Sequence, residues 1–143
     1  MKQKYRVIAI AAALLAAACA VLLIGGGRNG SPPEGVIVWL DGQEMTESTV
    51  SPGKGDGLRV IVTLDGAEIA NLPFGESHTL RIVQGEAENT VRITDRAVYM
   101  EAANCHGQDC VRMGEVTRGN METRSLGAFI ICLPHRISVE VRD

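Results

Sequence analysis

Hydrophobic positions in this chain form one long uninterrupted segment, followed by many short runs. Val7–Ile24 contains 18 residues without a charge. At a helical rise of about 1.5 Å per residue, this segment would span roughly 27 Å, close to the hydrocarbon thickness of a bilayer. The pattern therefore predicts a transmembrane helix over Val7–Ile24, which the glycines at positions 25–27 would end.

The charges around this segment predict its orientation. Lys2, Lys4 and Arg6 precede it, and no acidic residue does. Because basic residues stay on the cytoplasmic side, we expect a cytoplasmic N-terminus and an extracytoplasmic C-terminal part. The localisation that follows is the cell membrane, with a single pass.

Three alternatives to an uncleaved signal anchor fit the sequence less well. A cleaved signal peptide has an apolar region of about 7–15 residues, which is shorter than this one. A lipoprotein processed at Cys19 would need a leucine one position closer than Leu15, and a polar stretch where Val21–Ile24 is apolar. A buried soluble helix would have to be apolar on every side, which is rare in so small a chain.

The short runs predict β-strands. Val36–Glu44 (VIVWLDGQE) and Val60–Glu68 (VIVTLDGAE) match at seven of nine positions. Each is a β-branched run followed by Asp-Gly, a strong signal for a two-residue hairpin turn. Further strands are expected at Thr79–Val83, Thr90–Thr94, Ala97–Ala102, Ala128–Leu133 and Ile137–Val141, and the continuously apolar Ala128–Leu133 is expected to be central and buried.

These elements predict an all-β fold, a small antiparallel barrel or sandwich preceded by one transmembrane helix. The expected organisation is a cytoplasmic stub and anchor (1–27), a linker (28–35), a β-hairpin extension (36–57) and a β domain (58–143).

Charge and composition exclude one class of partner. Beyond the anchor the chain carries 11 basic and 17 acidic residues, a net charge of −6, and aromatic residues make up only 3%. Affinity for nucleic acid comes largely from basic charge and from stacking aromatic rings. We therefore expect no nucleic-acid partner.

Three cysteines lie in the outer part: Cys105, Cys110 and Cys132. Outside the cytoplasm thiols tend to oxidise, and three cysteines allow three different single bridges. A disulfide between Cys105 and Cys110 is preferred, because Gly107 helps the short loop to turn. Cys132 is then expected to be an inert core thiol.

The segments around these cysteines resemble the NusG domain II-like family. Its signature is an N-C-P-x-x-x-C-V segment followed by C-L-P-[N/H]-[K/R]. Here the first segment is matched by Asn104, Cys105, Cys110 and Val111, and the second by Cys132, Leu133, Pro134, His135 and Arg136, with Gly114 between them. His106 replaces the family's proline, and the polar stretch Thr117–Leu126 is longer than the family's usual tight turn. The resemblance implies a small all-β domain, one N-terminal membrane helix, and an association with membrane flavin or electron-transfer systems.

Two kinds of function remain open. The first is a non-enzymatic accessory domain that binds a membrane-protein partner, with the hairpin Val36–Val50 and the loop Thr117–Leu126 as exposed surfaces. The second is a metal-binding or thiol-redox protein, for which the candidate ligands are Cys105, His106, Cys110, Cys132 and His135. The cysteine spacing matches no strong zinc or dithiol motif. We identify no catalytic set and no cofactor motif, and we therefore favour the accessory domain.

Overall fold

The computed structural model describes residues 34–45 and 57–143. The predicted anchor Val7–Ile24 lies outside these residues. Within them, no helix combines the length and the apolar character needed to cross a bilayer.

The described residues form ten strands and one short helix. In chain order these are β1 (Val36–Leu40), β2 (Gln43–Glu44), β3 (Arg59–Leu64), β4 (Ala67–Pro73), β5 (His78–Gln84), β6 (Ala87–Ile93), β7 (Ala97–Ala103), α2 (Asp109–Arg112), β8 (Val116–Thr117), β9 (Phe129–Cys132) and β10 (Ile137–Arg142). The all-β class predicted from the sequence is confirmed, since α2 has only four residues.

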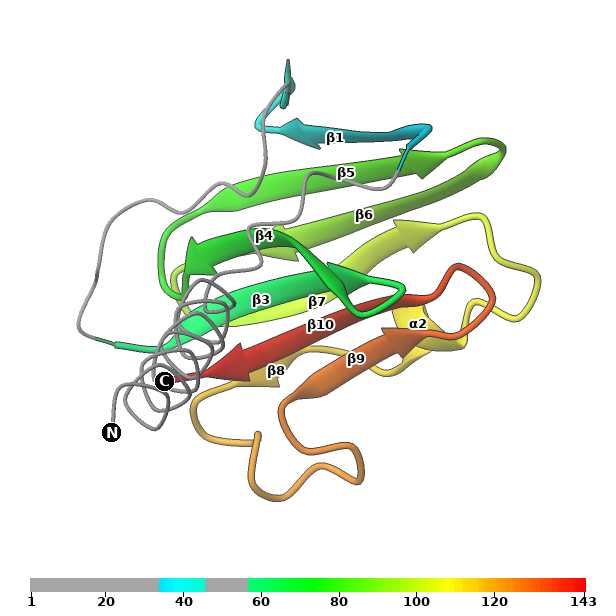
Figure 1. Ribbon diagram of the computed structural model, residues 1–143. Coiled ribbons are helices and arrows are strands. Elements are labelled where there is room, and N and C mark those ends of the chain that lie inside the picture. Colours follow the sequence, from blue (N-terminus) through cyan, green and yellow to red (C-terminus); the bar gives the residue numbers. More distant parts are fainter. Residues whose placement is uncertain (1–33, 46–56) are drawn as a thin grey trace, which may run out of the picture.

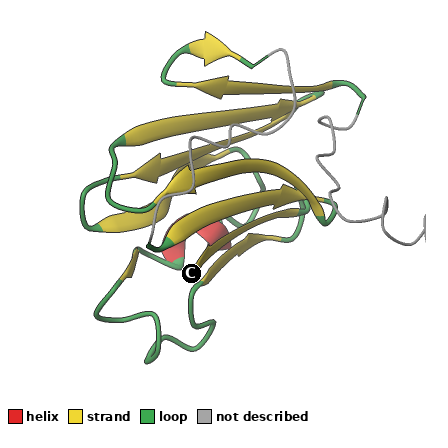
Figure 2. Cartoon of the chain, turned by 60° about the vertical axis from the view of Figure 1, so that its left-hand side comes forward, coloured by secondary structure: helices red, strands yellow, loops and turns green. Residues whose placement is uncertain are grey.

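The strands form two antiparallel sheets. One has six strands in the order β2-β1-β5-β6-β7-β8, and the other has four in the order β4-β3-β10-β9. Figures 1 and 2 show the two sheets as two layers. In the part of the chain that the structure describes, neither sheet closes into a barrel. Of the two predicted architectures, the sandwich describes this fold and the barrel does not.

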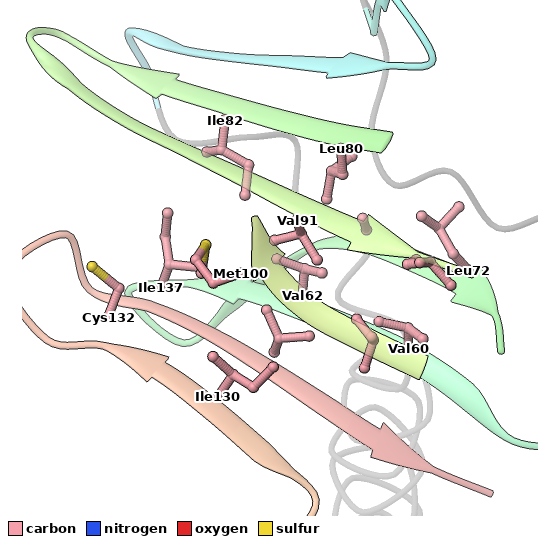
Figure 3. Packing of buried hydrophobic residues seen from close by; sticks show 14 of the residues in the cluster. Val60, Val62, Leu72, Leu80, Ile82, Val91, Met100, Ile130, Cys132 and Ile137 are labelled. Carbon is pink, nitrogen blue, oxygen red and sulfur yellow. The ribbon is translucent and has the colours of Figure 1, made fainter. Parts of the chain in front are cut away.

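The core lies between the two sheets and is built by alternation along the strands. Val91 and Ile93 of β6 are fully buried, as their alternation with polar residues predicts. Val60 and Val62 of β3 face them from the smaller sheet within one continuous cluster (Figure 3). Burial of each of these side chains stabilises the folded state by about 1.5–3 kcal/mol relative to leaving it exposed.

The two repeated Asp-Gly segments form the predicted turns, one in each sheet. Both turn residues have positive φ in each copy: 51° and 84° at Asp41 and Gly42, and 51° and 78° at Asp65 and Gly66. Type I′ turns require this conformation at both positions, which aspartate tolerates and glycine favours. The hairpin predictions are therefore confirmed.

Each turn aspartate also contacts a neighbouring strand. The Asp41 carboxylate accepts hydrogen bonds from the backbone N–H of Thr79 at 2.7 Å and from Nδ1 of His78 at 2.8 Å. Asp65 lies 3.2 Å from Nε of Arg136, just before β10. Partial burial alone would raise the pKa of Asp41, but the hydrogen bonds from His78 and Thr79 outweigh it, so the pKa is lowered from 3.8.

Two features differ from the simplest interpretation of the sequence. The run predicted as a central strand forms β9, which is an edge strand, because only β10 pairs with it. The hairpin predicted as an extension begins with β1, which pairs along all five residues with β5. Val38 of β1 is buried in the common core. β1 therefore packs as part of the sandwich.

Candidate functional site

Three cysteines from three elements meet at one end of the sandwich. Cys105 follows β7 of the larger sheet, Cys110 lies in α2, and Cys132 is the last residue of β9 in the smaller sheet. Helix α2 contacts both β7 and β9, which brings the three positions together. Figure 1 places α2 beside the end of β9, and Figure 3 shows Cys132 at the margin of the core.

The three sulfur atoms form a compact, buried cluster. The Sγ atoms of Cys105 and Cys110 are 3.7 Å apart, and all three Sγ atoms lie within 4.8 Å of one another. All three side chains are buried and are free thiols in this structure. The predicted Cys105–Cys110 disulfide stays a prediction. The structure adds that Cys132 lies in the same group. The alternative ligand set had included Cys132 with the other two cysteines, whereas its interpretation as an inert core thiol had not.

The environment of the cluster suppresses ionisation of its central thiol. Burial, followed by hydrogen bonding with Cys132 and Cys105, raises the pKa of Cys110 to about 12. At neutral pH the Cys110 thiol is therefore almost entirely protonated. Because only the thiolate is a strong nucleophile, this thiol reacts slowly. Catalytic dithiols have the opposite property, a depressed pKa at one sulfur. Cys110 is therefore poorly suited to act as the attacking thiol in rapid thiol–disulfide exchange.

A pocket of about 300 Å³ opens onto the cysteine cluster. It is lined by Cys105, Gly107, Gln108, Asp109, Cys110, Met113, Leu126, Ile131, Cys132, Leu133 and Pro134. Leu133 is 79% exposed and Leu126 is 42% exposed. The pocket thus has a floor of buried sulfur and a rim of exposed leucine.

The two histidines of the predicted ligand set lie apart from the sulfur atoms. Nδ1 of His135 is 2.5 Å from the side-chain oxygen of Asn89, and the backbone oxygen of His135 accepts a hydrogen bond from Gln84. His106 is exposed. Among the described residues, the group that could hold a metal ion contains the three cysteines and neither histidine.

Asn104 and Gly114, which lie beside the cysteines in the sequence, have structural roles. The side-chain oxygen of Asn104 accepts a hydrogen bond from the Glu88 backbone at 2.8 Å, and its amide donates to the Glu86 backbone at 2.7 Å. Asn104 therefore connects the segment after β7 to the turn that precedes β6. Gly114 has a φ of 71°, a conformation that glycine adopts without strain.

The long polar loop Thr117–Leu126 is held by specific hydrogen bonds. The Arg124 guanidinium donates to the backbone oxygens of Gly127, Phe129 and Met113, at 2.7, 3.1 and 3.0 Å. Asn120 contributes a second anchor, since its side chain bonds the backbone of Thr117. Arg124 thereby links the loop to α2 and β9, and it positions Leu126 at the pocket.

The sequence did not indicate that buried Asn89 and half-buried His135 meet. Asn89 is the buried polar residue of the described part of the chain, and it bonds both His135 and the sulfur of Met100. Asn89 lies in β6 and His135 in the turn after β9, 46 residues away. Two signals were available: Asn89 is a polar residue at an inward position of a strand, two places before Val91, and His135 belongs to a segment that resembles the family signature.

With this geometry in place, comparison with known proteins defines the family. The model of the family described as NusG domain II matches residues 8–143. The chain belongs to the NusG domain II family. The resemblance inferred from the cysteine segments is confirmed, and the two departures from the signature, His106 and the long loop, lie beside the pocket.

One solved structure shares the fold, and others are similar to parts of this chain. The Lin0431 protein from Listeria innocua is 23% identical, with a TM-score of 0.52, covering 62% of this chain and 98% of that one. A DUF1312 family protein from Ruminococcus gnavus is 28% identical, with a TM-score of 0.48, covering 60% of this chain and 99% of that one. One from Enterococcus faecalis is 18% identical, with a TM-score of 0.49 and coverages of 59% and 95%. None of the curated proteins matches the chain.

Proposed function

We propose that this NusG domain II protein is a non-enzymatic accessory domain, anchored in the membrane by Val7–Ile24 and displayed on its outer face. In this proposal the domain binds an integral membrane protein of the same envelope, within an assembly concerned with electron transfer. The apolar pocket beside Leu133 receives one apolar side chain from an outer loop of that partner.

The observation that carries this proposal is the distribution of exposed apolar side chains. Four large hydrophobic residues are exposed in the described part of the chain, and three of them, Leu126, Phe129 and Leu133, fall within eight residues of one another. Two of the three line the pocket. Apolar anchors that enter a neighbouring pocket supply most of the binding energy in protein interfaces, whereas scattered apolar residues need no explanation.

The size of the pocket supports a protein side chain as its occupant. Sites for drug-sized ligands and cofactors occupy about 300–1,000 Å³, and this pocket lies at the lower limit. Its lining is largely apolar, which suits an aliphatic or aromatic side chain. Tethering beside the partner in one membrane also raises the effective concentration, so a small contact suffices.

The test is recovery of the partner from membranes with matched variants of the full chain. Membranes are solubilised in mild detergent, and the chain is isolated with its bound proteins. We expect one integral membrane protein in stoichiometric amount, identified by mass spectrometry. Leu133→Lys should reduce its recovery at least about tenfold, because a charge at a desolvated anchor costs more than 1.4 kcal/mol.

Ile37→Lys is the control, because Ile37 is 41% exposed and lies on β1, outside the pocket. It should leave recovery unchanged. Absence of a stoichiometric membrane partner, or a partner retained equally by both variants, would refute the proposal. The binding should also be reproduced with the identified partner purified separately.

A further inference from the structure

The three buried cysteines form a site that neither the family description nor the proposed docking function explains. We propose that Cys105, Cys110 and Cys132 together bind one zinc ion, whose fourth coordination position faces the pocket. This inference goes beyond the docking proposal, because it depends on the sulfur floor of the pocket and not on the exposed leucines at its rim.

The spacing of the sulfur atoms matches the geometry of zinc thiolates. Zinc binds thiolate sulfur at about 2.3 Å in a tetrahedral arrangement, which places the ligand sulfur atoms about 3.8 Å apart. The Sγ atoms of Cys105 and Cys110 are already 3.7 Å apart. Since no pair in the cluster is separated by more than 4.8 Å, a movement of about 1 Å by Cys132 completes the site.

Charge selects a divalent ion for this position. Three thiolates carry three negative charges, and burial penalises any charge that is left unbalanced. A divalent ion leaves one negative charge on the complex, whereas monovalent copper leaves two. Soft thiolate ligands also favour zinc over calcium, magnesium or manganese. Compared with monovalent copper, which also prefers sulfur ligands, zinc therefore leaves the smaller buried charge on the complex.

The fourth position is open because, among the residues that the structure describes, no further Cys, His, Asp or Glu joins the three sulfur atoms. His135 is engaged by Asn89, and His106 is exposed. Asp109 lines the pocket, but its carboxylate is paired with Arg112. The pocket of about 300 Å³ has room for water or for a small sulfur- or oxygen-bearing ligand. Three protein ligands and an exchangeable fourth are the arrangement of open zinc sites.

Zinc binding at this position would also stabilise the packing of the two sheets against each other. The ligands come from the end of β7, from α2 and from the end of β9, so one ion would connect the two sheets. Each thiol that binds the ion releases its proton to solvent, and no oxidant or reductant takes part. Affinity should therefore fall as the pH is lowered, and zinc should raise the unfolding temperature.

The experiment uses the full chain in detergent, with Cys19→Ala so that all remaining thiols belong to the cluster. Reduced protein is titrated with zinc chloride, and bound metal is measured by elemental analysis after gel filtration. We expect one zinc per chain and protection of all three thiols from alkylation. Cobalt substitution should give the sulfur-to-metal charge-transfer absorption of a tetrahedral thiolate complex.

Two variants separate ligation from general stability. Cys132→Ser should weaken zinc binding at least about 100-fold, because even outer-shell changes cost 10–100-fold in affinity. Met113→Leu, which alters the same pocket without removing a ligand, should bind zinc like the parent chain. If Cys132→Ser fails to fold, thiol protection in the parent chain remains the deciding measurement.

Several outcomes would overturn the inference. These are no bound zinc with three reactive thiols, full affinity in Cys132→Ser, or copper bound in place of zinc. A Cys105–Cys110 disulfide in chain isolated from membranes without reductant would also overturn it, and would confirm the disulfide predicted from the sequence. None of these outcomes affects the recovery of a membrane partner through Leu133, so the two proposals fail separately.

Discussion

At the scale of single residues, Asn89 and His135 connect the family signature to the core. Asn89 is fully buried, and its amide oxygen can only accept, so Nδ1 of His135 must carry the proton that they share. The contact orients the turn that follows Cys132 and so helps to place that sulfur. A buried polar pair of this kind is costly to break on one side only.

Asn89→Ala should lower the free energy of unfolding by about 1–3 kcal/mol, because it leaves Nδ1 of His135 without a partner in a mostly buried position. Urea denaturation of the full chain in detergent, followed by circular dichroism, measures the change. A double-mutant cycle with His135→Ala provides the control. A coupling energy near zero between the two sites would contradict the role assigned to the pair.

At the scale of elements, the two Asp-Gly turns show how similar sequences serve different sheets. Both form the same turn, and each aspartate also reaches the start of an adjoining strand. Local sequence determines the turn, because aspartate tolerates positive φ and glycine favours it wherever they occur in the chain. Which strand lies beside the turn depends on the pairing of distant segments, His78 and Thr79 in one case and Arg136 in the other.

Asp41→Asn isolates the carboxylate, because Asn-Gly supports the same turn. The folded state lowers the pKa of Asp41 below its ordinary 3.8, so the unfolded chain binds this proton more readily. The contribution of the carboxylate is therefore present above pH 4 and is lost as the pH falls through the lowered pKa. Because Asp41 is partly exposed, we expect a difference below about 1 kcal/mol at neutral pH.

Urea denaturation between pH 7 and pH 3 measures this effect. The stability difference between the parent chain and Asp41→Asn should shrink as the pH falls below 4. A difference that is constant across this range would show that the charge of Asp41 makes no contribution.

The edge position of β9 illustrates where local pattern is insufficient. A continuous apolar run is typical of a strand covered on both faces, and Ala128–Leu133 suggests such a strand. Ile130 and Cys132 do face the core. Ile131 instead lines the pocket, and its backbone N–H lies 3.4 Å from the Met113 sulfur. Thus the second apolar face of β9 borders the pocket and contacts the α2 region, and no further strand packs on it in the described part of the chain.

At the scale of the whole molecule, β1 joins the larger sheet and closes part of the core. Val38 is buried although its hairpin was predicted as an extension of the domain. Trp39, the single tryptophan of the chain, lies on the same strand. Its fluorescence therefore reports on β1, whereas circular dichroism reports on both sheets.

Val38→Ala should reduce the free energy of unfolding by about 1–3 kcal/mol through lost burial and a small cavity. Ile37→Ala, on the exposed face of the same strand, should change it by less than about 0.5 kcal/mol. Tryptophan fluorescence and circular dichroism should give coincident transitions in urea. Loss of the fluorescence signal at a lower urea concentration would show that β1 unfolds separately from the sandwich.

The sequence by itself determined the features that depend on neighbouring residues. Alternation along each strand, the Asp-Gly turns and the cysteine segments predicted the all-β class, most strand positions and the family. These follow from local conformational preference and from a period of two, both of which act over a few residues.

Only the tertiary structure decided which distant residues meet. It placed Cys132 beside Cys105 and Cys110, Asn89 beside His135, and Leu126 and Leu133 around one pocket. The sheet pairings that cause these contacts join segments tens of residues apart, and many pairings satisfy the same alternation. The choice among them is made by close packing of the whole core, which no single segment contains.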